Sequence, residues 1–343
     1  MNRHILMVAA TVLLACAAYG RAGVNLETTR LRYIGPVNIT ETVKTRQGIE
    51  QITLSYGDNS VTVRGDEKPP MSRRAPSKVF YSVRWPDHAQ IMSMDADGSH
   101  PTCLTPLTDS DYYPALSPDG TTIAFTTHRD NIRALYLMNP DGTNQRRLTT
   151  EGDAGLGAWS PDGSRLAFSS NRNGKYCIYV MKRDGTDVRR LTEGPAEDCP
   201  NWSPDGKTIV FESSVNPIWR IWVVNADGTG LKAISQDKWS ERWPQWSPDG
   251  KTIVFTSYEH GAGDIYLMRA NGSHSTRLTT NPAEDRQPFW AADGSHILFH
   301  SSRAGRFDIY VLDVATKEEH RMTVEAKDTA DGMTFLRRIQ AEE

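Results

Sequence analysis

The chain has 343 residues, of which 38% are hydrophobic and 24% are charged, and its formal net charge is -3. This is the composition of an ordinary globular protein, long enough for one large closed β-domain or two smaller domains. The nearly neutral charge lacks the basic footprint that nucleic acid requires and offers no polybasic membrane patch, so we expect neither as a partner.

Residues 1–20 have the pattern of an export signal. An apolar run over residues 5–18 follows a basic start, is short for a membrane span, and gives way to polar sequence. Ala18-Tyr19-Gly20 suits ordinary release, which we favour, whereas Leu13-Leu14-Ala15-Cys16 resembles a lipoprotein signal that ends before Cys16. We expect a periplasmic or secreted protein without a membrane span, with lipid anchoring through Cys16 as the alternative.

The remaining cysteines are few for an exported protein. They are Cys103, Cys177 and Cys199. A set this small and odd in number predicts a fold that is not built on disulfides. A single bridge between Cys177 and Cys199 and two free buried thiols both stay open at this point.

Residues 21–76 precede the repetitive part of the chain. Within them, residues 49–65 alternate apolar and polar side chains around Gly57-Asp58-Asn59-Ser60, which predicts a hairpin. Lys68-Pro69-Pro70 is typical of a linker. We therefore expect a small β-extension and linker here, to which the sequence assigns no function.

The rest of the chain repeats one phrase, Trp246-Ser247-Pro248-Asp249-Gly250 and its relatives. The glycines of the phrase stand 43 or 44 residues apart, at Gly120, Gly163, Gly206, Gly250 and Gly294. A fixed period of this size is the signature of a repeat architecture. The proline and glycine suit a tight turn, and we expect the aspartates of these turns to be structural.

Each repeat contains four strand signals. In the fifth unit, the strand that ends at Trp246 is followed by apolar segments at 252–255 and 264–268 and by Leu278-Thr279, and the other units match in register. Such units are four-stranded antiparallel sheets. Residues 79–105 supply three strands of a further unit, whose Trp-bearing strand is missing.

The missing strand has a counterpart at the other end of the chain. Residues 331–336 resemble 285–290, so residues 333–337 are expected to complete blade 1 and to close the ring, which removes exposed sheet edges. The predicted fold is all-β, a six-bladed β-propeller of four-stranded antiparallel blades, closed by this C-terminal strand. It occupies residues 77–338 and leaves 339–343 as a tail.

The turn phrase, the Ile-Tyr-x-Met strand at 265–268, the Asp-Gly-Thr turn at 227–229 and the terminal Leu-Thr resemble the TolB-type, WD-repeat-like β-propeller family. The resemblance implies a periplasmic propeller that binds a protein at one mouth of its channel. Related blades occur in polysaccharide lyases and in serine peptidases. The N-terminal α/β domain of TolB has no counterpart in residues 21–76, and the chain contains no Gly-x-Ser-x-Gly elbow.

A ring of acids marks one mouth of the predicted channel. The position six residues before each turn serine lies on the face that also carries the loops between second and third strands. Its occupants are Asp111, Ala154, Glu197, Glu241, Asp285 and, in the closing strand, Asp331. Each acid either ties down its own loop by pairing with an arginine, such as Arg129 or Arg303, or takes part in binding.

Blades 4 and 5 depart from this pattern, because their loops lack the arginine that Glu197 and Glu241 would need. Several aromatic and charged residues gather near these two acids: Asp198, Trp219, Trp239, Arg242, Trp243 and His260. Tryptophan and arginine provide rigid contact area and directional hydrogen bonds, so we predict a binding platform at blades 4 and 5. The alternative is that Trp219 and Trp243 pack between blades.

The predicted function is therefore non-catalytic binding of a protein or peptide partner in the cell envelope at this mouth. The alternative is a carbohydrate-active enzyme, a lyase that acts on an acidic oligosaccharide at the same mouth. We expect no cofactor and no metal site. Carboxylate oxygens around a channel could hold Ca²⁺, but the sequence contains no Asp-x-Asp-x-Asp-Gly loop to support such a site. His300, beside Phe299 on a strand, is expected to be a packed histidine.

Overall fold

The computed structural model divides the chain into two compact units, Met1–Arg73 and Arg74–Glu343. It describes residues 78–84, 88–96, 98–106, 108–129, 132–215, 217–236 and 238–322, and the backbone of 38–45, 48–56, 59–64 and 334–340. The predicted signal segment with Cys16, the linker, Asp331 and residues 341–343 lie outside the described residues, whereas residues 339 and 340 of the predicted tail belong to the last strand.

The first unit contains an antiparallel sheet in the order β1-β2-β3. Its strands are β1 (Asn38–Thr45), β2 (Gly48–Tyr56) and β3 (Asn59–Arg64). Strands β2 and β3 pair from Gln51 opposite Arg64 to Tyr56 opposite Asn59. This is the hairpin that the alternation over residues 49–65 predicts.

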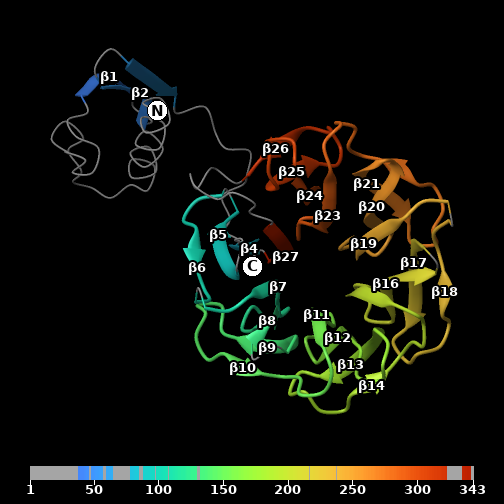
Figure 1. Cartoon of the computed structure of the whole chain (residues 1–343). Coiled ribbons are helices and arrows are strands. Elements are labelled where there is room, and N and C mark those ends of the chain that lie inside the picture. Colours follow the sequence, from blue (N-terminus) through green and yellow to red (C-terminus); the bar gives the residue numbers. More distant parts are fainter. Residues whose placement is uncertain are drawn as a thin grey trace. The chain divides into compact units, whose positions relative to one another are not determined.

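The second unit is a six-bladed β-propeller whose blades form a ring in Figure 1. Blade 1 comprises β27 (Thr334–Gln340), β4 (Lys78–Arg84), β5 (Ala89–Asp95) and β6 (Thr102–Cys103). Blade 2 comprises β7 (Asp111–Leu116), β8 (Ile123–Thr127), β9 (Ala134–Met138) and β10 (Arg146–Arg147). Blade 3 comprises β11 (Ala154–Trp159), β12 (Arg165–Ser170), β13 (Cys177–Lys182) and β14 (Arg189–Arg190).

Blade 4 comprises β15 (Glu197–Trp202), β16 (Thr208–Val215), β17 (Ile218–Asn225) and β18 (Lys232–Ala233). Blade 5 comprises β19 (Glu241–Trp246), β20 (Thr252–His260), β21 (Ala262–Arg269) and β22 (Thr276–Arg277). Blade 6 comprises β23 (Asp285–Trp290), β24 (His296–Ser301), β25 (Asp308–Asp313) and β26 (Glu319–Arg321). All pairs within the blades are antiparallel, as predicted, and no α-helix occurs among the described residues.

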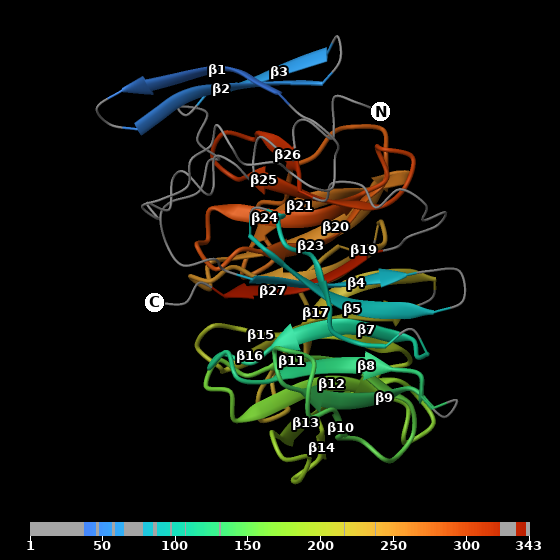
Figure 2. The ribbon, with the colours of Figure 1, turned by 90° about the vertical axis from the view of Figure 1, so that its left-hand side faces the viewer.

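Ring closure is confirmed by the pairing of β27 with β4, which extends from Thr334 opposite Val83 to Gln340 opposite Lys78. Figure 2 shows these two segments, far apart in the chain, side by side. The strand is longer than the predicted segment 333–337. Because β27 occupies the inner edge of blade 1, both ends of the propeller domain contribute to one sheet.

The core lies between neighbouring blades. A phenylalanine in the second strand of blades 2 to 6 is fully buried, at Phe125, Phe168, Phe211, Phe255 and Phe299. Phe211 belongs to a cluster that also includes Ala158 and Ile178 of blade 3, so the apolar faces of adjacent blades bury one another. A single blade has no other means of covering both of its faces, which explains the strict repeat.

The turn phrase has the structural role that the sequence predicts. In blade 5, the Ser247 hydroxyl donates to the Asp249 carboxylate at 2.7 Å, and the Gly250 amide donates to the Ser247 carbonyl at 2.9 Å. Gly250 has φ +70°, a conformation that costs a residue with a side chain about 1 kcal/mol. The turn aspartate and glycine therefore fix the connection between the first and second strands.

Candidate functional site

The inner strands of blades 2 to 6 begin at the predicted acidic positions, 111, 154, 197, 241 and 285. The loops before these strands and the loops between the second and third strands lie on one face of the ring, which we call the entry face. The Ser-Pro-Asp-Gly turns and the turns between the third and fourth strands form the opposite face, called the turn face. The labelled inner strands lie nearest the centre of the ring (Figure 1).

Asp111 and Asp285 are structural in their contacts. Both side chains are fully buried, and each forms an ion pair with an arginine of its own blade: Arg129 at 3.2 Å and Arg303 at 3.0 Å. Arg129 also contacts Asp109, 3.1 Å away. The two acids therefore tie the loop between the second and third strands to the start of the inner strand, and they offer a partner no exposed carboxylate.

Glu197 is also buried, but it uses hydroxyl and backbone groups in place of an arginine. The Thr192 hydroxyl donates to the Glu197 carboxylate and at the same time accepts the Ile178 amide at 2.9 Å. Burial raises the pKa of Glu197, and the bonds from Thr192 and from the backbone oppose that rise. The threonine of the Leu-Thr phrase thus connects one blade to the acid that opens the next.

Glu241 is the least satisfied acid of the ring. Its Oε2 is buried and accepts no hydrogen bond from the described residues, and no arginine pairs with it there. Burial raises the pKa of Glu241 to about 7; the Ser235 hydroxyl opposes this rise, and the Glu259 carboxylate adds to it. Among the described residues neither Glu197 nor Glu241 forms an ion pair with an arginine, although the charges of Arg190 and Arg220, respectively, oppose the rise of their pKa values.

The raised pKa of Glu241 predicts a pH dependence of stability. Between pH 4.5, its usual pKa, and about pH 7, folded Glu241 holds a proton that the unfolded chain releases. Stability therefore falls as pH rises across this window, by about 3 kcal/mol at most. Urea unfolding from pH 4.5 to pH 8 should show this slope in wild-type protein and a shallower one in Glu241→Gln. Equal slopes would contradict the assignment.

Arg242 lies between two tryptophans, with its guanidinium carbon 4.4 Å from the ring centre of Trp219 and 4.6 Å from that of Trp243. Its charge is matched by Glu212 of blade 4, whose fully buried carboxylate lies 2.6 Å away. Glu212 also accepts the Trp243 amide at 2.7 Å. Trp219 and Trp243 thus pack around an ion pair that joins blade 4 to blade 5, which is the alternative raised by the sequence.

Sequence reasoning missed Glu212. Its repeat position carries Thr126, Ser169 and Thr256 in other blades, and His300 in blade 6. Thr126 and Thr256 accept an amide of the next inner strand, Leu156 and Gln287 respectively. A carboxylate at a position that carries a small hydroxyl residue in blades 2, 3 and 5 was a signal in the sequence, because a buried carboxylate needs a charged partner to balance it. His300 is fully buried, as predicted.

The remaining predicted residues differ in accessibility. Trp239, in the loop before β19, is 43% exposed and is one of four large exposed hydrophobic residues in the described part of the chain. His260, at the end of β20, is also exposed. Asp198 is half-buried and accepts a hydrogen bond from the Ser169 hydroxyl at 2.6 Å. The accessible part of the predicted platform is therefore centred on Trp239 and His260.

Cys177 and Cys199 are buried thiols and Cys103 is an exposed one, and none of these three described cysteines forms a disulfide. No group of three or more histidine, cysteine or acidic residues among the described positions could hold a metal ion. In the same part of the chain, no helix is long and apolar enough to cross a membrane.

The family follows from a direct comparison. The TolB beta propeller domain matches residues 151–241 and 220–336, which together span more than half of the chain. The chain belongs to the TolB β-propeller family. No curated protein matches it. The predicted family resemblance is confirmed.

Solved structures agree with this assignment. TolB from Acinetobacter baumannii is 18% identical, with a TM-score of 0.68, over 88% of this chain and 82% of its own. A putative TolB from Agrobacterium tumefaciens is 20% identical, with a TM-score of 0.60, over 72% and 89%. A chain of a nidogen/laminin complex is 12% identical, with a TM-score of 0.61, over 76% and 98%. At these identities the likeness establishes the TolB-type fold alone.

Proposed function

We propose that this TolB-type propeller is an exported binding protein, and that it holds a protein or peptide partner on the entry face at blades 4 and 5. The observation that carries the proposal is Trp239, a tryptophan 43% exposed in the loop before β19, on the face that also carries the exposed His260 at the end of β20. Exposed tryptophan is rare on a free surface and frequent at the centre of protein interfaces.

The start of β19, which follows Trp239, is held in place by several contacts. The Glu212–Arg242 pair, its two flanking tryptophans and the half-buried Glu241 fix the start of β19, just after Trp239. A preorganised surface loses little conformational entropy on binding, which favours affinity. A propeller-like chain also occurs in the nidogen/laminin complex, an assembly of proteins, which is consistent with partner binding by this fold.

The buried acids limit what the partner touches. Asp111, Glu197 and Asp285 are at most 2% exposed, so we assign them to the support of the loops. The contact surface then consists of Trp239 and His260, with the Glu259 carboxylate next to it. An aromatic anchor with a histidine and a carboxylate beside it suits a polypeptide that carries a basic or hydrogen-bonding side chain next to an apolar one.

The proposal is tested by capture from an envelope extract, with immobilised wild-type protein compared with Trp239→Ala and Leu231→Ala. Leu231 is 46% exposed on the turn face of blade 4, so it is a matched apolar control on the opposite face. Loss of Trp239 should weaken capture by about 2 kcal/mol, roughly thirtyfold, and loss of Leu231 should leave it unchanged. Equal capture by all three proteins contradicts the site, and degradation of uronate oligosaccharides would favour the lyase.

A further inference from the structure

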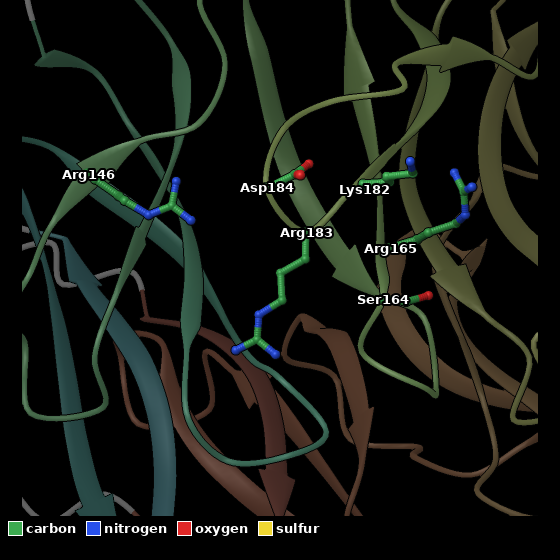
Figure 3. Close-up of a pocket in the computed structure, with 6 residues that line it drawn as sticks. All are labelled: Arg146, Ser164, Arg165, Lys182, Arg183 and Asp184. Atoms are coloured by element: carbon green, nitrogen blue, oxygen red, sulfur yellow. The ribbon is translucent and has the colours of Figure 1, made fainter.

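A pocket lies on the turn face, between blade 2 and blade 3. Its volume is about 480 Å³, and it is lined by Arg146, Ser164, Arg165, Lys182, Arg183 and Asp184. Figure 3 shows Arg146 extending from the blade 2 side, with Lys182 and Arg165 beside each other on the blade 3 side. Four cationic side chains and one carboxylate thus surround a single open space, on a protein whose net charge is -3.

The charge at this place is specific to blade 3. Arg165 and Lys182 stand directly opposite each other in the β12–β13 ladder. The same ladder position pairs Lys78 with Asp95 in blade 1, Thr208 with Asn225 in blade 4, Thr252 with Arg269 in blade 5, and His296 with Asp313 in blade 6. Of the five blades whose described ladder reaches this position, only blade 3 places two cations there, and directly opposed like charges destabilise a sheet.

These cations are only partly neutralised by the protein. Arg165 contacts Asp187 through Nη2 at 2.9 Å, whereas its buried Nη1 donates to no described residue. Among the described residues, neither Lys182 nor Arg146 forms an ion pair within 4.0 Å. The Asp184 carboxylate is engaged by its own turn, where it accepts the Thr186 hydroxyl at 2.7 Å and the Thr186 amide at 2.9 Å.

Arg183 lines the pocket and contacts both blades. Its guanidinium donates to Asp119 of blade 2 at 2.6 Å and lies 5.3 Å from the ring centre of Trp159. The residue at this position in blades 4 and 5 is an alanine, Ala226 and Ala270. Arg183 therefore joins blade 2 to blade 3 across the pocket. The positive charge that the protein does not balance comes from the other cationic lining residues, above all Lys182 and Arg146.

We propose that this pocket binds a ligand through its phosphate groups, independently of the partner site on the entry face. Arg165 and Lys182 present positive charge to the phosphate from blade 3, and Arg146 presents it from blade 2. Arginine and lysine together suit a phosphate dianion, because the guanidinium provides directed donors and the ammonium a concentrated charge. Bound phosphate would also offset the repulsion between Arg165 and Lys182.

The repeat itself supplies the test variant. Arg165→Thr with Lys182→Asn recreates the Thr208–Asn225 pair that blade 4 carries at the same ladder position. The control is Lys232→Thr with Lys251→Thr, which removes two positive charges from the turn face of blades 4 and 5. Binding of sodium pyrophosphate and of sodium sulfate is measured by calorimetry at one ionic strength, together with the melting temperature of each protein.

Wild-type protein should bind pyrophosphate at a single site, at least about tenfold more tightly than sulfate, and the control should match it. The Arg165→Thr/Lys182→Asn variant should lose about tenfold or more in affinity while melting no lower than wild type without ligand. Three outcomes overturn the proposal: unchanged pyrophosphate affinity in that variant, an equal loss in the control, or equal affinity for the two anions.

Discussion

Removal of residues 330–343 should lower the free energy of unfolding by about 4 kcal/mol or more, because β4 then loses its inner partner along the whole strand. The exposed edge of blade 1 would also present unpaired amides and carbonyls, which promotes aggregation. Urea and thermal unfolding of the truncated protein measure the loss.

A shorter truncation isolates the strand. Removal of residues 341–343 leaves β27 intact, so this protein should unfold with wild-type stability. If the long truncation stayed soluble and melted at the wild-type temperature, the closing role of β27 would be wrong.

The second large effect is expected at the ion pair between blades 4 and 5. Arg242→Met leaves the fully buried Glu212 carboxylate without its counter-charge and should cost about 3–5 kcal/mol. Burial already raises the pKa of Glu212, and Arg242 is the main group that opposes the rise. Without Arg242, Glu212 is expected to take up a proton more readily, so the destabilisation should shrink as pH falls.

Arg286 supplies the matched control for this substitution. It occupies the same inner-strand position in blade 6, but its partner Glu284 is partly exposed and 3.4 Å away. Arg286→Met should therefore cost only about 0–1 kcal/mol from the ion pair. Denaturation of both variants across pH 5 to 8 separates the two cases, and equal losses at neutral pH would show that Glu212 does not depend on Arg242.

The fold could be predicted because each element recurs in register. The turn phrase, the buried phenylalanine strand and the Leu-Thr ending each have a local physical cause, and five copies identify the sixth blade even though its strands come from both ends of the chain. The length of β27 was not predictable, since strand ends depend on the partner strand β4 and not on the local sequence.

The site was predictable only in part. The missing arginines at Glu197 and Glu241 follow directly from comparison of the repeats. The burial of the acids could not be predicted in this way. A buried acid is satisfied by hydroxyls such as that of Thr192, which belongs to the previous blade. The cationic pocket could not be predicted from the sequence, because Arg146 and Lys182 line one pocket only when blade 2 packs against blade 3.

The central claim is that blades 4 and 5 of the entry face contact a polypeptide partner. A photo-crosslinking amino acid at position 239, in cells that produce the protein, tests this most directly. Position 132 is the control on the same face at blade 2, where Ile132 is 39% exposed, and position 231 is the control on the turn face of blade 4. The account predicts a discrete adduct, identified by mass spectrometry as one polypeptide, from position 239 and not from 132 or 231. No adduct from position 239, or the same adducts from all three positions, would contradict it.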